Sequence, residues 1–182
     1  MLNGERVLLR ATTRDDVPML HRLESDADLQ QLTNTRPWRP ESLEAAYARY
    51  DKELVDLDKA MALFTIVPRD RADEVGSGVG YGLLWGIDVH QRVAHLGLSL
   101  VPEARGQGYG LDAVRVLLDY GFRIRALLRI GCETLTTNTG MIKVAEAAGF
   151  VREGVLRSVG YVDGERVDEQ VFGLLYEEWK QK

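Results

Sequence analysis

The sequence is poor in cysteine and in long apolar runs, and both absences limit what the protein can be. Cys132 is the single cysteine among 182 residues, so no disulfide can form within the chain. This usage is typical of a reducing compartment, and we interpret Cys132 as a small buried hydrophobe rather than a nucleophile. No apolar run approaches the roughly 18 residues of a membrane-spanning helix, and the charged N-terminus does not resemble a signal peptide. We therefore expect a cytoplasmic protein with no membrane partner.

Positive charge is also scarce. The chain has 23 Lys and Arg against 28 Asp and Glu, which gives a formal net charge of −5. Because nucleic-acid binding usually shows as an excess of basic residues, this balance argues against nucleic acid as the main partner. Hydrophobic residues make up 45% of the chain, enough for one ordinary core. We expect residues 1–182 to form a single domain.

Hydrophobic periodicity predicts an α/β protein of mixed architecture. The predicted strands cover residues 5–11, 61–67, 75–87, 91–101, 128–136, 150–159 and 167–176, and the predicted helices cover residues 13–25, 41–57, 111–125 and 138–148. Short polar turns between the three central strands indicate antiparallel neighbours. The strand, helix, strand unit that follows indicates one parallel pair.

Four glycines alternate along the middle strand of the predicted sheet. They are Gly76, Gly78, Gly80 and Gly82, which fall on one face if the strand is regular. Two interpretations remain open. The bare face either lets a neighbouring element pack closely or leaves a floor for a ligand.

The stretch VPEARGQGYG, residues 101–110, has the composition of an anion-binding loop. Glycines let backbone N–H groups converge, the following helix adds about half a positive charge at its N-terminus, and an arginine suits phosphate. A dinucleotide fingerprint would need glycine at position 111, which is leucine, and the Gly-Lys-Ser/Thr of a Walker loop is absent. The stretch therefore predicts a pyrophosphate site of another kind, with a ligand-free bend as the alternative.

Three segments resemble a known family. RGQGYG, residues 105–110, resembles the R/Q-x-x-G-x-G/A signature of GCN5-related N-acetyltransferases (GNAT). NTGMIKVAEAAGF, residues 138–150, and the tail, residues 164–179, are similar to the branch that acetylates ribosomal-protein N-termini, the RimJ/RimL-like enzymes. The resemblance implies the GNAT fold: a mixed, mostly antiparallel twisted sheet of about seven strands with about four helices, whose central parallel strands splay apart.

The resemblance also implies an activity and a cosubstrate. The family transfers acetyl from acetyl-CoA directly to a primary amine, here of a protein N-terminus or a small molecule, without a metal. The residues implied to hold acetyl-CoA are Leu100 and Val101 along the pantetheine arm, Arg105, Gly106, Gln107, Gly108, Tyr109 and Gly110 around the pyrophosphate, and Asn138 after the next strand. For Asn138, a simple helix N-cap is an alternative that is compatible with this role.

Direct transfer needs a general base, an oxyanion donor and a proton for the departing thiolate. Glu133 matches the position where some relatives place a catalytic glutamate. His95 lies where the protein-acetylating branch often carries the glutamate of an A-E-I-G-Y pattern, and an imidazole is able to take the same proton. Either residue is alternatively a structural polar group. A backbone N–H near Leu100 is the expected oxyanion donor.

The chain departs from the family around the leaving group. The serine of N-x-x-S is Met141, and the tyrosine that many members carry is Ala145. Ser99, Tyr161 and solvent remain as sources of the proton. The same departures support an alternative of another class, a catalytically silent acyl-CoA-binding or regulatory module.

The first helices of this fold usually wall the acceptor side. The aromatic residues expected to line it are Trp38, Trp85, Tyr81 and Tyr47, with core packing as the alternative. Acidic residues that either attract a cationic amine or are merely solvated are Asp26, Asp28, Asp88 and Asp168. The acceptor stays open among peptide N-termini, aminoglycoside-like antibiotics, polyamines and amino-acid-like metabolites, and the exposed final strands leave a homodimer open.

Overall fold

The computed structural model describes residues 1–33, 38–54 and 60–181. Its strands are β1 (Leu2–Asn3), β2 (Val7–Ala11), β3 (Ala62–Pro68), β4 (Gly80–Asp88), β5 (Val93–Leu100), β6 (Arg129–Leu135), β7 (Val151–Val162) and β8 (Glu165–Leu175). Its α-helices are α1 (Val17–Ser25), α2 (Ala27–Thr33), α3 (Leu43–Arg49), α4 (Tyr109–Asp119), α5 (Thr139–Ala148) and α6 (Tyr176–Trp179). Short 3-10 turns are η1 (Arg14–Asp16), η3 (Arg69–Arg71) and η4 (Pro102–Ala104), and π turns are η2 (Tyr50–Leu54) and η5 (Tyr120–Ile124).

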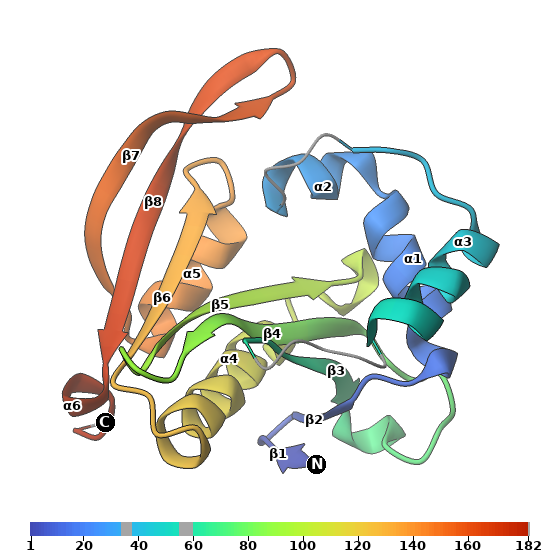
Figure 1. The fold of residues 1–182 in the computed structure, drawn as a ribbon, viewed down its shortest axis with the longest axis horizontal. Coiled ribbons are helices and arrows are strands. Elements are labelled where there is room, and N and C mark those ends of the chain that lie inside the picture. The colour runs from blue at the N-terminus through green and yellow to red at the C-terminus, as the bar shows by residue number, and fades with distance from the viewer. Residues whose placement is uncertain (34–37, 55–59, 182) are drawn as a thin grey trace.

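In the described part of the chain, eight strands form one sheet in the order β1-β2-β3-β4-β5-β6-β8-β7. Every neighbouring pair is antiparallel except β5 and β6, which run parallel. That parallel pairing covers only three positions and ends at His95 and Gly131, after which the two strands diverge (Figure 1). The predicted fold class is confirmed, with eight strands and six α-helices in place of about seven and about four.

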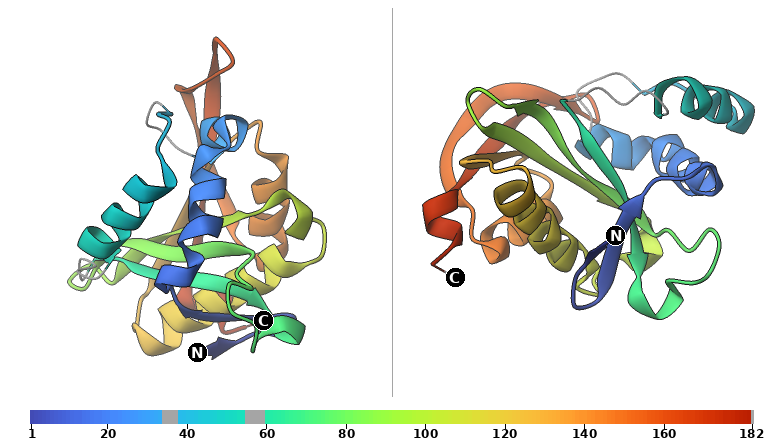
Figure 2. Two further views of the ribbon diagram at one scale, coloured as in Figure 1. Left: turned by 90° about the vertical axis from the view of Figure 1, so that its right-hand side faces the viewer. Right: turned by 60° about the horizontal axis from the view of Figure 1, so that its bottom comes forward.

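The helices cover both faces of the sheet. Helices α1, α2 and α3 lie on one side and α4 and α5 on the other, as the two turned views make clear (Figure 2). We call these sides the α1 face and the α4 face. A Cβ added to Gly82 would lie 2.9 Å from Leu117 of α4, so close packing explains the bare position in β4. No floor is left for a ligand there, and Gly76 and Gly78 precede the strand.

Local signals fix the ends of α5 as the sequence predicts. The Asn138 side chain accepts a hydrogen bond from the Met141 N–H at 3.2 Å, which is an N-cap contact. Gly149 adopts φ +96° and its N–H bonds to the last carbonyls of the helix. A residue with a side chain is strained in that left-handed conformation, so the chain turns at Gly149 into β7.

Other boundaries differ from the prediction. Helix α2 occupies a segment predicted as loop, because the Asp26 carboxylate accepts the Leu29 N–H at 3.0 Å and starts a helix there. The helix predicted over residues 41–57 ends as α3 at Arg49 and continues as the π turn to Leu54; residues 55–57 lie outside the described residues. Strand β4 begins at Gly80 rather than at residue 75.

A buried carboxylate ties the first helix to the sheet. Asp16 has no exposed surface and accepts hydrogen bonds from both terminal guanidinium nitrogens of Arg10, at 2.6 and 2.8 Å. It also accepts the Thr13 N–H at 2.8 Å and the Thr65 hydroxyl at 3.0 Å. The start of α1 is therefore held against β2 and β3 by one side chain.

The β7–β8 hairpin projects beyond the rest of the molecule (Figure 1). Strand β7 is the edge of the sheet, and its apolar side chains Val155, Leu156 and Val159 are between 37% and 48% exposed. Among the residues that the structure describes, no helix is long and apolar enough to cross a membrane.

Candidate active site

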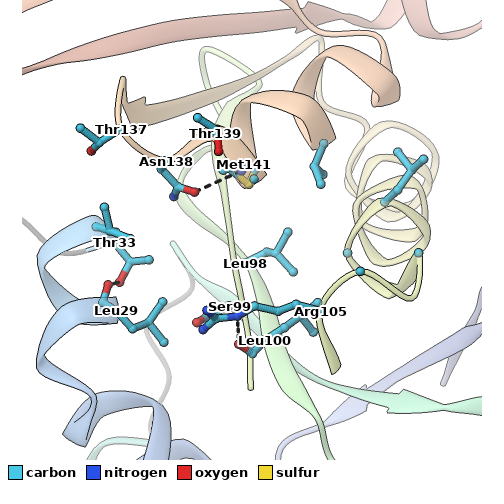
Figure 3. A pocket seen from close by; sticks show the side chains of 17 residues that line it. Leu29, Thr33, Leu98, Ser99, Leu100, Arg105, Thr137, Asn138, Thr139 and Met141 are labelled. Carbon is cyan, nitrogen blue, oxygen red and sulfur yellow. Dashed lines mark hydrogen bonds between the residues drawn. The ribbon is translucent and has the colours of Figure 1, made fainter. Parts of the chain in front are cut away.

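A cavity of about 530 Å³ opens where β5 and β6 diverge. Leu98, Ser99 and Leu100 of β5 form one wall, and the start of α5 at Asn138 forms another (Figure 3). Thr33 of α2 lies across the opening from Asn138. Since the walls come from β5, from the segment that follows β6 and from helices of both layers, the cavity follows from the splayed strands.

The glycine-rich loop closes one end of this cavity. Gly106 and Gly108 have φ +71° and +81°, a conformation that is strained for a residue with a side chain. Helix α4 begins directly after Gly108. A Cβ on Gly110 would be 3.6 Å from Leu100, so the helix starts close against β5. The loop thus exposes backbone at the positively polarised end of α4, which is chemistry suited to a phosphate.

The predicted cosubstrate residues are placed unevenly around the cavity. Those that line it are Leu100, Arg105, Gly106, Gly108, Gly110 and Asn138. Arg105 donates from Nε to the Leu100 carbonyl at 3.0 Å and so lies across the end of β5. Val101 is buried, and its N–H already bonds to the Val79 carbonyl at 2.9 Å. Gln107 faces a separate cavity on the other side of the loop, and Tyr109 is half-buried against the core.

A second cavity of about 170 Å³ adjoins the first and shares Thr33, Leu98, Asn138 and Met141 with it. Tyr81, Trp85 and Glu133 are among the other residues that line it. Two other predicted acceptor aromatics lie apart from these walls. Trp38 is 41% exposed and donates its indole N–H to the Glu24 carbonyl, and Tyr47 lies under the Arg14 guanidinium.

The two base candidates, which sequence reasoning treated as alternatives, lie in contact. His95 Nδ1 is 2.9 and 3.0 Å from the two carboxylate oxygens of Glu133. Because an ionised carboxylate only accepts, Nδ1 carries the hydrogen in this contact. Trp85 stacks on the imidazole with 4.5 Å between ring centroids, and a Cβ on Gly131 would lie 3.1 Å from Nδ1. Glu133 lines the second cavity, and the imidazole of His95 holds the Glu133 carboxylate in place through the Nδ1 contact.

Ser99 lines the first cavity and carries a buried hydroxyl. The residue is 5% exposed, and within the described ranges its Oγ makes no hydrogen bond of ordinary geometry, although the Tyr81 phenol lies close enough to interact with it. Tyr81 is its direct partner across the strand pair. Burial and the charge of Glu24 raise the pKa of the Tyr81 phenol, and the neighbouring Ser99 hydroxyl opposes the rise. Tyr161, the other proton source considered, is 65% exposed on the projecting hairpin.

Sequence reasoning missed Glu169, which shares the face of Glu133. The register pairs Glu133 with Val171 and Leu135 with Glu169, so the two carboxylates are diagonal neighbours on β6 and β8. Partial burial and the charge of Glu133 raise the pKa of Glu169. No local pattern gives this proximity, because it depends on how two distant strands pair.

Other acidic residues have structural partners. Asp26 caps α2, Asp88 accepts the N–H groups of its own turn, and Asp168 accepts the Ser158 N–H. Cys132 is 1% exposed, and burial raises the pKa of its thiol to about 12. Over the described ranges, no group of three or more His, Cys, Asp or Glu residues is arranged to hold a metal ion.

Comparison with known proteins connects this site to a chemistry. Residues 6–151 match the acetyltransferase (GNAT) domain family. Protein p20 of Bacillus licheniformis, described as an uncharacterized N-acetyltransferase, is 29% identical over 178 residues, 98% of this chain and 97% of the relative. YdaF of Bacillus subtilis, described as a putative ribosomal N-acetyltransferase, is 32% identical over 105 residues, 58% of this chain and 57% of the relative.

A solved structure has the same fold. Spermidine N-acetyltransferase from Vibrio cholerae, crystallised with CoA and spermine, superposes with a TM-score of 0.84 at 23% identity, covering 97% of this chain and 99% of that one. One relative is thus described as a putative ribosomal N-acetyltransferase and one structural neighbour as a spermidine N-acetyltransferase, and the RimJ/RimL-like branch is not singled out. The family match spans most of the chain, and the relatives are N-acetyltransferases. The chain therefore belongs to the GNAT acetyltransferase family and is an N-acetyltransferase that transfers an acetyl group to an amine.

Proposed function

We propose that the protein transfers acetyl from acetyl-CoA to the primary amine of a small cationic molecule. The observation that supports this class of acceptor is the second cavity, which adjoins the slot between β5 and β6. It has a volume of about 170 Å³ and is lined by aromatic side chains and by the Glu133 carboxylate. A carboxylate and aromatic faces attract an ammonium group. The cavity suits a slim amine better than a folded protein surface.

The first cavity suits the donor. Acetyl-CoA supplies the activated acetyl group as a thioester, and its arm carries amides that hydrogen bond as a β-strand does. Leu98, Ser99 and Leu100 offer a strand edge where β6 has turned away, and Asn138 faces them across the slot. The loop at Gly106 and Gly108 suits the pyrophosphate.

Glu133 is the proposed general base and His95 its positioning residue. An ammonium has no lone pair, so the acceptor must lose a proton to the carboxylate, directly or through one water, before nitrogen attacks. The Nδ1–H of His95 fixes the orientation of Glu133, and Trp85 fixes the imidazole. Ser99 then donates a hydrogen bond to the departing thiolate, a role that Met141 and Ala145 lack the groups to fill.

Substitutions at the pair test this assignment. Glu133→Gln removes the base and should lower kcat by about 10²- to 10⁴-fold, a typical contribution of acid–base catalysis. His95→Ala loses the N–H donor and should lower kcat with little change in KM, whereas the amide N–H of His95→Asn should restore much of the rate. Glu146→Gln, on the exposed side of α5, is the matched control.

The measurement is CoA release from acetyl-CoA with a panel of amines across about pH 6 to 9. Full activity of Glu133→Gln over that range would reject it as base, and inactive His95→Asn with intact CoA binding would make the imidazole itself the base. Turnover of peptide N-termini alone would contradict the small-amine proposal. Tight CoA binding with no acetylation of any amine would contradict the acyl-transfer assignment.

A further inference from the structure

The glycine-rich loop has a cavity on each side. Besides the slot between β5 and β6, a cavity of about 460 Å³ lies on the side of the loop that faces the N-terminal strands. Gly106, Gly108 and Leu111 line both cavities. A ligand whose pyrophosphate rests on the loop therefore has access to either side.

Two arginines face the outer cavity, Arg6 from the turn before β2 and Arg115 from α4. The Arg6 side chain lies over the loop: a Cβ on Gly108 would be 3.3 Å from its Cδ, and its NH1 is 3.4 Å from the Gln107 carbonyl. Arg115 is exposed, and the described residues offer it no ion pair or side-chain hydrogen bond. Glu5 and Asp112 line the same cavity, so what suits an anion here is the placement of the two guanidinium groups and not an excess of positive charge.

Within the described residues, neither acidic residue at this cavity forms an ion pair with Arg6 or Arg115. Asp112 of α4 accepts the backbone N–H groups of Glu5, Arg6 and Val7 at 3.1, 2.8 and 2.9 Å. Its two oxygens are turned to that backbone, and the residue is 6% exposed. The contact also fixes the turn that carries Arg6. Glu5 is exposed at the rim of the cavity.

We infer that Arg6 and Arg115 bind a phosphomonoester, which on the proposed cosubstrate is the 3′-phosphate of the CoA ribose. The inference rests on the proposed function, because CoA carries that group a few bonds beyond the pyrophosphate. A guanidinium presents a fork of donors that matches phosphate oxygens, and two of them suit a dianion. These arginines would make the enzyme select CoA over dephospho-CoA.

Calorimetric titration with CoA and with dephospho-CoA tests this selection. The wild-type protein should bind CoA about tenfold more tightly. Arg115→Ala and Arg6→Gln should each remove most of that preference without weakening dephospho-CoA, because both guanidinium groups make their charge-assisted bonds to the phosphomonoester alone. Arg123→Ala, beyond the end of α4, is the control and should leave the preference unchanged. Glu5→Gln should strengthen CoA binding alone.

Competition separates the cosubstrate from free phosphate. Inorganic phosphate can compete with both ligands at the loop, but it should weaken CoA binding more than dephospho-CoA binding, and salt should shrink the preference. Equal binding of both ligands by the wild-type protein, or equal losses for both in Arg115→Ala, would overturn the inference and leave the proposed function standing. A wild-type protein that binds neither ligand would overturn both.

Discussion

Replacing Asp16 with asparagine should destabilise the protein strongly, although the residue lies outside both cavities. The carboxylate is fully buried and bridges the start of α1 to β2 and β3 through Arg10 and Thr65. Removing one partner of a buried ion pair costs about 3–5 kcal/mol, because the other charge loses its compensation. Arg10 retains 20% side-chain exposure, which places the expected loss near the lower end, about 3 kcal/mol.

The loss can be followed by thermal and urea unfolding. For a chain of this size, 1 kcal/mol corresponds to about 2–4 °C in Tm, so Asp16→Asn should melt about 6–12 °C lower. Asp15→Asn is the control, because the Asp15 side chain is next to Asp16 in the sequence but is exposed and has no buried partner. A change below about 1 kcal/mol for Asp16→Asn would refute the view that this carboxylate anchors the first helix.

The same variant carries a pH signature. Burial alone would raise the pKa of the Asp16 carboxyl, but hydrogen bonds from Arg10, the Thr13 backbone and Thr65 hold it below its ordinary value of 3.8. A lowered folded-state pKa adds stability above the unfolded pKa, and this stability disappears as pH falls through the folded one. The gap between wild type and Asp16→Asn should therefore be full near neutral pH and close in acid. A constant gap would contradict the ionic origin.

Two further predictions concern the loop and the thiol. Gly108→Ala places a side chain beside Arg6 at φ +81°, and the left-handed backbone costs about 1–2 kcal/mol for a residue other than glycine. The variant should raise the KM for acetyl-CoA about tenfold with little change in kcat. An unchanged KM would contradict the role of the loop. The Cys132 thiol is buried, and burial raises its pKa to about 12. It should resist aromatic disulfide reagents near neutral pH in the folded protein and react within minutes in guanidinium. Rapid labelling of the native protein would show the interpretation of Cys132 to be wrong.

Local chemistry explains which parts of the fold were predictable. Asn138 and Gly149 mark the ends of α5 because capping and left-handed φ are properties of single residues. Asp26 caps α2 in the same way, but α2 has only seven residues and shows too little periodicity, so the segment after Ser25 was predicted as loop. The glycines from 76 to 82 mislead because alternation is meaningful only inside a regular strand, and β4 starts at Gly80.

The site was predictable as a set of residues and not as an arrangement. Glu133 and His95 both stand out in the sequence, yet their contact joins residues 38 positions apart through the parallel register of β5 and β6. Glu169 joins them through the pairing of β6 with β8. Register is set by the packing of whole faces, which a single segment does not encode. The stacking of Trp85 on His95 likewise depends on the register of β4 with β5, which pairs these two residues.

The short parallel pairing of β5 with β6 has a mechanical consequence. Three matched positions are the sheet's own connection between a half formed by β1 to β5 and a half formed by β6, β8 and β7. A narrow seam of this kind resists bending much less than the long antiparallel ladders on either side of it. A ligand bound in the slot would contact both halves of the sheet and so strengthen the connection between them for as long as it stays bound. Occupancy and rigidity of the whole sheet would then rise and fall together.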